Sequence, residues 1–302
     1  MDQNGDSCIG YAKLNGPTTV VERWERPILH RDYDYEQRGL EDPRVTKIGD
    51  TFYMTYVAHD GKNAQTAYAE SSDLTHFDKK GIISAQLTYQ EAEELFQEQK
   101  LKDQYKIFAS YYEDEAGQDV LLWHKDIFLF PRKIQNKYIL VHRILPDIQL
   151  AFFDNFNELG TKNFWFNHIQ NLHKFVLLEN KHWFETQSIG GGCVPIETDA
   201  GWLFIFHAIE SRNIGRVYHA CAALLDKETP LHVLGRLHEP LFSPTEEWER
   251  SGMVSNVVFP TGTAQFGDTL YIYYGAADKR IAVAELSISE LIAELLNPAN
   301  HH

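Results

Sequence analysis

A strand–turn–strand pattern recurs along the chain, and this repeat limits the folds that the sequence can adopt. Each copy has a proline near its start, a short strand, a polar turn such as Gly49-Asp50 or Gly267-Asp268, an aromatic-rich strand and a further apolar strand. Four copies are complete, and residues 8–14 match only the back half of a fifth. Because each copy is typical of a small antiparallel sheet, we predict an all-β fold, a five-bladed β-propeller. The prolines that open the repeats are Pro43, Pro131, Pro195 and Pro260.

Two segments depart from the repeat, and both predict helix. Residues 88–112 mix charged side chains with apolar ones at helical spacing, and residues 155–178 predict a short helix and a connecting strand. We therefore predict a single domain over residues 1–302, with a helical insertion between blades at about 86–125. Decoration of the rim, an oligomer contact and a lid over the channel are alternatives for the insertion, so formation of a homo-oligomer stays open.

The composition excludes several classes of partner. The chain has 302 residues and a formal net charge of −15, which argues against nucleic acid and anionic membranes because both need a basic surface. No apolar run reaches transmembrane length, and residues 1–6 do not resemble a signal peptide. We expect a cytoplasmic protein, or a periplasmic one if a leader was trimmed. The three cysteines, Cys8, Cys193 and Cys221, predict neither a disulfide framework nor a zinc site.

The densest group of functional side chains is Glu41-Asp42-Pro43-Arg44. Proline disfavours helix at the residue before it, so we expect Asp42 to be extended and to lie at a strand entrance. Arg44 would keep one carboxylate ionised, while a buried second acid could hold a proton. The alternative is a solvated turn with a surface ion pair.

A second sequence pattern that occurs twice supports the repeat. Residues 35–39 (Tyr-Glu-Gln-Arg-Gly) and 248–252 (Trp-Glu-Arg-Ser-Gly) share the pattern aromatic-Glu-x-x-Gly, and each precedes the first strand of a repeat. In a propeller, these first strands line the central channel, so their entrances surround one end of it. The residues at the repeat openings are therefore expected to converge.

Seven short motifs occur in an order that resembles a known family. They are Glu41-Asp42-Pro43-Arg44, His142-Arg143, Ile189-Gly190-Gly191-Gly192, Gly201-Trp202-Leu203 with His207, Ala222-Ala223-Leu224-Leu225-Asp226, Asn256-Val257-Val258-Phe259-Pro260 and Tyr273-Tyr274-Gly275-Ala276-Ala277-Asp278. Between about residues 9 and 296, the chain resembles glycoside hydrolase family 130, the β-mannoside phosphorylases and β-1,2-mannosidases, whose fold is a five-bladed propeller.

The resemblance implies a role for each matching residue. Asp42 corresponds to the general acid, which protonates the leaving oxygen through a hydroxyl of the mannose. Sugar binding is implied for Glu41, Arg44, Asp126, Asn256, Phe259 and Asp278. Binding of phosphate or another acceptor is implied for His142, Arg143, His207 and Tyr218.

Two departures from the family pattern favour water as the acceptor. Ser188 stands where phosphorylases usually carry lysine, and His219 stands where they usually carry arginine. Because a phosphate dianion in a partly dry site needs charged donors, these losses should weaken its binding. Glu210 or Glu249 would then activate water opposite Asp42, as in inverting glycosidases whose carboxyl groups lie about 6.5–9.5 Å apart.

Several of these residues have structural alternatives. Glu249 matches Glu36 in the repeated motif, and Glu210 could lie in a solvated loop with Arg212. His207 could be a core histidine, and Asp278 could cap a turn. Family members also usually begin with a further strand pair carrying a mannose-binding arginine, and this chain starts after it.

The expected function is hydrolysis of a β-mannosidic bond, β-1,2 in the first instance, with inversion and without a metal or cofactor. The alternatives are a β-mannoside phosphorylase, with inorganic phosphate as co-substrate and α-mannose 1-phosphate as product, and a sugar-binding propeller without turnover. The expected partner is a mannoside or another oligosaccharide.

Overall fold

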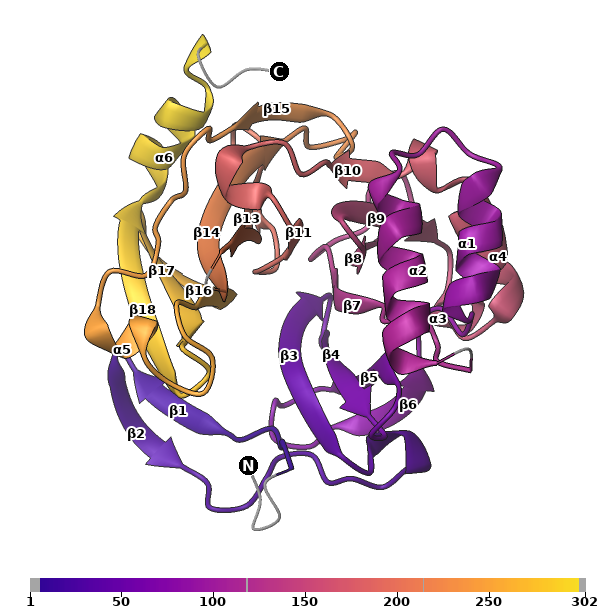
Figure 1. Cartoon of the computed structure of the whole chain (residues 1–302). Coiled ribbons are helices and arrows are strands. Elements are labelled where there is room, and N and C mark those ends of the chain that lie inside the picture. The colour runs from indigo at the N-terminus through magenta and orange to yellow at the C-terminus, as the bar shows by residue number, and fades with distance from the viewer. Residues whose placement is uncertain (1–5, 118, 214, 299–302) are drawn as a thin grey trace. The chain divides into compact units, whose positions relative to one another are not determined.

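The computed structural model describes residues 6–117, 119–213 and 215–298. The chain divides into two compact units: unit 1 is Met1–Leu145 with Gln149–Phe175, and unit 2 is Pro146–Ile148 with Val176–His302. Within the described residues, the strands form four sheets and one two-stranded hairpin (Figure 1). This number agrees with four complete repeats and one partial repeat. The single domain and the five blades stay predictions.

Unit 1 contains the hairpin and two of the sheets. The hairpin pairs β1 (Ala12–Asn15) with β2 (Thr19–Arg23), and η1 (Asp34–Glu36) precedes the first sheet. This sheet is antiparallel in the order β3 (Gly39–Ile48), β4 (Thr51–His59), β5 (Ala64–Ser71) and β6 (Asp78–Ile82). The second sheet contains β7 (Lys125–Leu129), β8 (Tyr138–Ile144) and β9 (Asp147–Phe153).

The predicted helical insertion consists of two helices, α1 (Tyr89–Gln97) and α2 (Gln104–Ala116), so the single helix predicted over residues 88–112 is wrong in its middle. Thr88 starts α1 in a capping box with Glu91. After α1, the side chain of Gln99 donates a hydrogen bond of 2.8 Å to the carbonyl of Leu95. This bond satisfies a helix-end carbonyl and stabilises the interruption.

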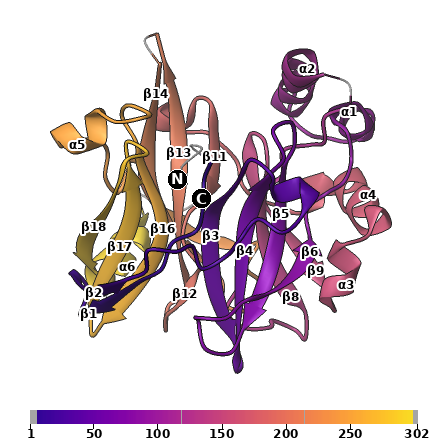
Figure 2. The same cartoon turned by 90° about the horizontal axis from the view of Figure 1, so that it is seen from below.

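The segment 155–178 is helical, as predicted, but it contains more than one helix. It comprises α3 (Phe156–Leu159), α4 (Lys162–Gln170), η2 (Leu172–Lys174) and the strand β10 (Val176–Leu178). Figure 2 shows the four α-helices of unit 1 grouped beside β5 and β6. They pack an apolar core against the sheets, in which Trp165 is fully buried and its indole N–H donates to the carbonyls of Ile83 and Leu159.

Unit 2 contains the other two sheets. One has the order β11-β13-β14-β15, with β12 also paired to β13, and the other has the order β16-β17-β18. Leucine, isoleucine and alanine side chains of these sheets pack against α6. The elements are η3 (Trp183–Glu185), β11 (Ser188–Gly191), β12 (Ile196–Glu197), β13 (Trp202–Arg212), β14 (Gly215–Leu225), β15 (Val233–Arg236), α5 (Glu247–Arg250), β16 (Val258–Phe266), β17 (Thr269–Ala276), β18 (Arg280–Ser287) and α6 (Ile288–Leu295).

The four prolines do not open equivalent strands, which corrects the alignment of the repeats. Pro43 and Pro260 lie inside first strands, beside irregularities in the pairing. Pro131 instead follows β7, and Pro195 lies between β11 and β12. Among the described residues, no helix has the length and apolar character needed to span a membrane.

Candidate functional site

Asp42 and Asp126 occupy equivalent β-bulges in the two sheets of unit 1. The pairing of β3 with β4 shifts around Asp42, and the pairing of β7 with β8 shifts around Asp126. Both residues have left-handed backbone conformations, with φ of 51° and 56°. Aspartate tolerates this region better than most residues, and a bulge redirects the side chain that it carries. The two bulges therefore place two carboxyl groups at corresponding positions.

The conformation of Asp42 corrects one prediction. The proline that follows it was expected to hold Asp42 in extended geometry at a strand entrance. Asp42 lies instead within β3, and its φ of 51° is left-handed. The local preference of an X-Pro pair is overridden because the bulge inserts one extra residue between the paired positions Glu41 and Arg44.

Two threonine hydroxyls bind the first sheet to β7 near these bulges. Thr55, on β4, donates a hydrogen bond of 2.5 Å to the carbonyl of Ile127, which is next to Asp126. Thr46, on β3, donates one of 3.2 Å to the carbonyl of Leu129. Both threonines are buried, so these bonds form in a low-dielectric setting that strengthens them. They hold the two bulged strands in a defined relation within unit 1.

The surroundings of Asp42 suit a general acid. Burial raises the pKa of its carboxyl group, and the positive charge of Arg44 lowers that pKa in part. Asp126 raises the pKa, Lys125 lowers it and Glu41 raises it. Desolvation disfavours the carboxylate, so Asp42 stays protonated to a higher pH than an exposed aspartate. Lys125 was not among the predicted site residues, although Lys125-Asp126 matches Glu41-Asp42 in the repeat.

Arg143 forms an ion pair with Asp126 in which Nε lies 3.1 Å from Oδ2. Asp126 is almost fully buried, and Arg143 retains a small exposed fraction. Each side chain offsets part of the cost of burying the other in this poorly hydrated place. Arg143 therefore balances the second carboxylate of this cluster, and the phosphate-binding role implied for it stays a prediction.

His142 does not present a nitrogen to an anion, which corrects its implied role in binding phosphate. The residue is fully buried. Its Nδ1 lies 2.8 Å from His124 Nε2, and its Nε2 lies 2.9 Å from His168 Nε2. Burial lowers the pKa of His142 well below its usual value, so the ring is neutral. Both ring nitrogens serve an internal chain of histidines.

In unit 2, His207, Tyr218 and Phe259 form an aromatic cluster. The ring centroid of His207 lies 4.6 Å from that of Phe259 and 6.3 Å from that of Tyr218. The backbone N–H of Tyr218 donates a hydrogen bond of 2.9 Å to the carbonyl of Asn256, whose φ is 60°. Four residues that the family resemblance singled out are thus together in space.

Ser188 lies on the same sheet face as this cluster. It pairs with Ile209, which in turn pairs with Tyr218, and directly opposite residues on neighbouring strands share a face. Its hydroxyl is fully buried and has no hydrogen-bond partner within the described residues. A buried hydroxyl without a partner is costly, so a ligand atom would satisfy it.

Glu210 lies on the opposite face of the β13–β14 sheet from His207 and Tyr218. The register of these strands is continuous, and side chains alternate between faces, so Glu210 shares its face with His219. Its Oε2 lies 2.8 Å from Nη2 of Arg212 and 3.2 Å from Nε2 of His219. The bond from Arg212 lowers the pKa of Glu210. The pairing with Arg212 agrees with the structural alternative, but Glu210 lies in a strand and not in a loop.

Glu249 has a structural role in this geometry. Its Oε2 accepts backbone N–H bonds from Thr245 at 2.7 Å and Glu246 at 2.9 Å. Its Oε1 accepts a bond of 2.6 Å from the hydroxyl of Tyr274, and the residue is 3% exposed. The hydrogen bonds support the alternative that Glu249 corresponds to Glu36, and they leave it poorly placed to activate water.

Asp278 lies in the turn between β17 and β18, where it is exposed and has a φ of 50°. The preceding residue, Ala277, accepts the backbone N–H of Met253 at 2.9 Å. Gly252 permits this approach, because a Cβ atom there would lie 2.1 Å from the carbonyl oxygen of Ala277. The glycine of the repeated motif is thus explained, and the sugar-binding role of Asp278 stays a prediction.

Comparison with known proteins places this geometry in a family. The chain matches the family model Glyco_hydro_130, described as beta-1,4-mannooligosaccharide phosphorylase, over residues 2–296. It is 34% identical over 289 residues to a 1,2-beta-oligomannan phosphorylase of Thermoanaerobacter sp. (strain X514), which covers 94% of this chain and 80% of the relative. Within the described residues, no group of three or more His, Cys, Asp or Glu side chains could hold a metal ion.

Solved structures give the same result. The fold is similar to that of the beta-1,2-mannobiose phosphorylase from Listeria innocua in complex with beta-1,2-mannobiose, with a TM-score of 0.68 and 28% identity over 92% of this chain and 66% of that chain. A structure described under the heading of GH130 glycoside hydrolases that target beta-1,2 mannosidic linkages in Candida mannan has a TM-score of 0.67 at 22% identity, over 97% of this chain and 77% of that one, which shows a shared fold alone. The chain belongs to glycoside hydrolase family 130.

Proposed function

We propose that the chain is a β-1,2-mannoside phosphorylase, which transfers a mannosyl group to inorganic phosphate with inversion. One observation carries this choice over hydrolysis. Neither glutamate that could activate water is well placed for it, because Glu249 holds backbone N–H groups and Tyr274, and Glu210 lies across the sheet from His207. The phosphorylases among the relatives support the same choice.

In the proposed reaction, Asp42 is the proton donor. The glycosidic oxygen leaves with a proton from Asp42, directly or through a mannose hydroxyl. An oxygen of phosphate attacks the anomeric carbon from the opposite face, so that the C1–O bond to the leaving sugar breaks as a C1–O bond to phosphorus forms. The product is α-mannose 1-phosphate. The raised pKa of Asp42 supports this role, because a general acid must be protonated at the working pH.

The proposed phosphate site uses Ser188, His207 and Tyr218 of unit 2. All three lie on one face of the sheet, and the buried Ser188 hydroxyl needs a partner. A phosphate oxygen is a strong acceptor for such a donor. A carboxylate on the same face would repel phosphate, and Glu210 lies on the other face.

One observation favours hydrolysis as a second candidate. Ser188, a neutral residue of the proposed phosphate site, stands where phosphorylases of the family usually carry lysine, whereas His219, which stands where they usually carry arginine, lies on the other face of the sheet. Fewer cations mean weaker phosphate binding.

We also propose that the four sheets and the hairpin are the blades of a five-bladed β-propeller, which the number of repeats supports.

The test is to incubate the full chain with β-1,2-mannobiose, with and without inorganic phosphate. We expect cleavage only with phosphate, and α-mannose 1-phosphate as the sugar phosphate. Mannose release at the same rate without phosphate would establish the hydrolase instead. Binding without cleavage under both conditions, unchanged in Asp42→Asn, would mean a sugar-binding protein without turnover.

A further inference from the structure

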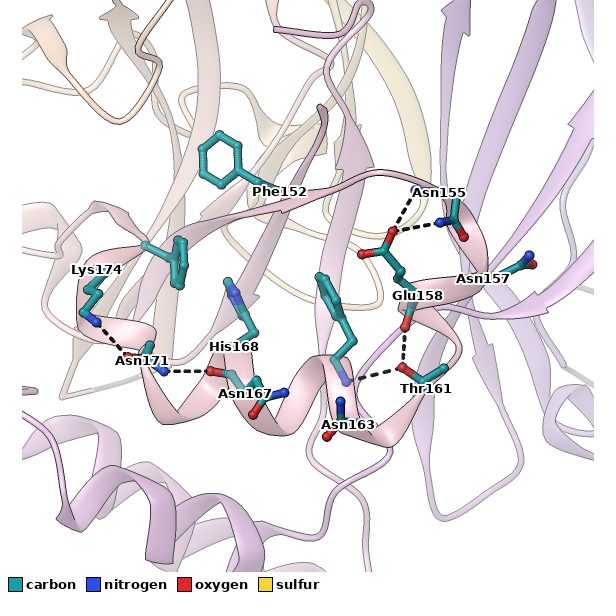
Figure 3. Close-up of a pocket in the computed structure, with 12 residues that line it drawn as sticks. Phe152, Asn155, Asn157, Glu158, Thr161, Asn163, Asn167, His168, Asn171 and Lys174 are labelled. Carbon is teal, nitrogen blue, oxygen red and sulfur yellow. Dashed lines mark hydrogen bonds between the residues drawn. The ribbon is translucent and has the colours of Figure 1, made fainter. Parts of the chain in front are cut away.

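Helix α4 and the segments around it border a pocket of about 580 Å³ in unit 1 (Figure 3). Its volume lies in the range of roughly 300–1,000 Å³ that is usual for small-molecule sites. The lining combines three phenylalanines with five asparagines, which is both apolar and rich in amides. None of the candidate catalytic, sugar-binding or phosphate-binding residues lines this pocket. Its link to them is His168, a lining residue whose Nε2 lies 2.9 Å from Nε2 of His142.

Asn163, Asn167 and Asn171 lie along one face of α4 and its end, four residues apart, and all three line the pocket. Asparagine is a poor residue inside a helix because its amide competes with the backbone. Asn171 gains internal bonds, since its Oδ1 accepts from Lys174 at 2.8 Å. The side-chain amides of Asn163 and Asn167 make no hydrogen bond to any residue that the structure describes. Both side chains are exposed and line the pocket, so their amides can exchange bound water for the hydroxyl groups of a ligand.

Aromatic rings form the apolar wall of this pocket. The rings of His168 and Phe175 are stacked with centroids 4.5 Å apart. Phe164 lies parallel to His168 at 6.2 Å, with an angle of 3° between the planes. Phe152 extends the wall, 6.3 Å from Phe175. Such a band of aromatic rings suits the apolar C–H groups of a pyranose, while neighbouring amides can both donate to and accept from its hydroxyls.

The buried histidines determine which hydrogen His168 presents. The backbone N–H of Ala85 donates to Nδ1 of His124 at 3.0 Å, so the proton of this neutral ring is on Nε2. His124 Nε2 therefore donates to His142 Nδ1, and His142 Nε2 donates to His168 Nε2. His168, also neutral because burial lowers its pKa to about 3, must then carry its proton on Nδ1.

This Nδ1–H donor has no partner among the residues that the structure describes, although His168 is only 7% exposed. A nearly buried donor of defined direction at the wall of a pocket calls for an acceptor atom from a ligand. The lining holds one acidic and one basic side chain, Glu158 and Lys174, which have opposite charges and already form hydrogen bonds to Asn155 and Asn171. The pocket therefore favours a neutral ligand.

We propose that this pocket is a second carbohydrate site, which binds a neutral oligosaccharide without cleaving it. A sugar ring packs on the phenylalanine rings of the wall, and its hydroxyl groups bond to Asn163, Asn167 and the Nδ1–H of His168. The identification of the sugar as a β-mannoside rests on the proposed function. The site would hold a mannan chain on the enzyme between successive cleavages.

The test follows the imidazole nitrogen signals of the full chain labelled with ¹⁵N-histidine, while β-1,2-mannotriose is added without phosphate. We expect the His168 signals to shift and saturate. In the double variant Asn163→Ala/Asn167→Ala, the half-saturating concentration should rise about tenfold or more, the usual effect of losing hydrogen bonds in a site. Alanine favours helix, so the variant should fold. Gln170→Ala, an exposed position of α4 outside the pocket, is the matched control and should behave like the wild type.

Three results would overturn the proposal. The first is that the His168 signals do not respond to a saturating sugar. The second is that the double variant responds at the same sugar concentration as the wild type. The third is a change of oligomeric state in the double variant without any response to sugar, which would mean that a second copy of the chain covers the pocket. Cellotriose is tested in parallel. A response to cellotriose but not to mannotriose would support the carbohydrate site and count against the mannoside. Phosphate-dependent turnover is measured separately, so the proposed function can fail while the His168 response stands.

Discussion

The hydroxyl of Tyr274 donates a hydrogen bond of 2.6 Å to the carboxylate of Glu249, and this contact joins the segment before β16 to the second strand of its sheet. The same contact occurs in unit 1, where the hydroxyl of Tyr56 on β4 donates to Glu36 at 2.8 Å. Each glutamate also accepts two backbone N–H groups from the residues before it. The aromatic-Glu-x-x-Gly motif is therefore a structural link that the repeat uses at least twice.

Glu249→Gln should reduce stability more than catalysis. The amide keeps the shape but replaces charge-assisted bonds with neutral ones, and it can leave a buried group unsatisfied, at a cost of about 1–3 kcal/mol. We expect a lower urea midpoint, with turnover per folded molecule close to that of the wild type. Glu36→Gln, in the other copy of the motif, should lose at least as much stability, because Glu36 also forms an ion pair of 2.7 Å with Lys79. A wild-type midpoint combined with a loss of about 100-fold or more in kcat, the scale of a catalytic acid or base, would return Glu249 to the active site.

Much of the fold was predictable because the repeat has strong local signals. The turn at Gly49-Asp50 and the alternation on either side of it predicted β3 and β4, and both are present. The break between α1 and α2 was not predictable, because the helical pattern continues across residues 98–103 and the interruption depends on a contact from Gln99 to the distant Ile169. The alignment on the prolines was wrong because Pro43 and Pro260 lie inside first strands, whereas Pro131 follows β7 and Pro195 lies between β11 and β12.

The site was predictable in its residue types and less so in its geometry. The acids at positions 42 and 126 were singled out, but the bulges that hold them depend on strand pairing, which single residues do not reveal. The family resemblance implied that His142 binds phosphate, and its place in a buried histidine chain could not be foreseen because its partners, His124 and His168, lie 18 and 26 residues away in the sequence. The face that Glu210 occupies follows from the register of β13 with β14, which was not known from the sequence.

The charges around Asp42 should set the basic limb of the pH profile. A general acid loses activity as the pH rises through its pKa. Lys125 lowers the pKa of Asp42 and Asp126 raises it, so Lys125→Met should move the limb to higher pH and Asp126→Asn should move it to lower pH. The measurement is kcat/KM for β-1,2-mannobiose with saturating phosphate, across the pH range. Shifts in the same direction, or no shift in either variant, would show that the limb does not report Asp42.

Asp42→Asn should remove the proton donor while keeping the shape of the side chain. We expect kcat to fall by about two to four orders of magnitude on β-1,2-mannobiose, the usual contribution of general acid catalysis. A mannoside with a good leaving group, such as 4-nitrophenyl β-mannoside, needs less protonation and should lose much less. An equal loss on both substrates would mean that Asp42 serves binding or folding and not proton transfer.

Ser188→Ala should weaken phosphate binding selectively. The buried hydroxyl has no partner among the described residues, so its removal costs the folded protein little. The loss of its bond to phosphate should raise the KM for phosphate by roughly 5- to 150-fold, corresponding to about 1–3 kcal/mol. The KM for mannobiose should stay the same. Ser243→Ala is the control, because this hydroxyl bonds to His219 at 2.8 Å, on the other face from Tyr218. Equal effects of the two variants on phosphate would contradict the proposed phosphate site.

The buried histidine chain should make the protein sensitive to mild acid. Burial lowers the pKa values of His124, His142 and His168, so the unfolded chain binds protons in a range where the folded chain does not. Stability is therefore highest above the unfolded histidine pKa of about 6.5 and falls as the pH drops below it, by about 1.4 kcal/mol per pH unit for each histidine that is protonated only on unfolding. Urea midpoints between pH 7.5 and 5.5 measure this slope. His142→Phe should make the slope shallower whatever its effect on absolute stability, while His232→Gln, at an exposed position, should leave it unchanged. If the wild type and both variants have the same slope, the buried histidines already bind protons in the folded protein. The arrangement of three neutral rings, each with its proton on a defined nitrogen, would then be wrong.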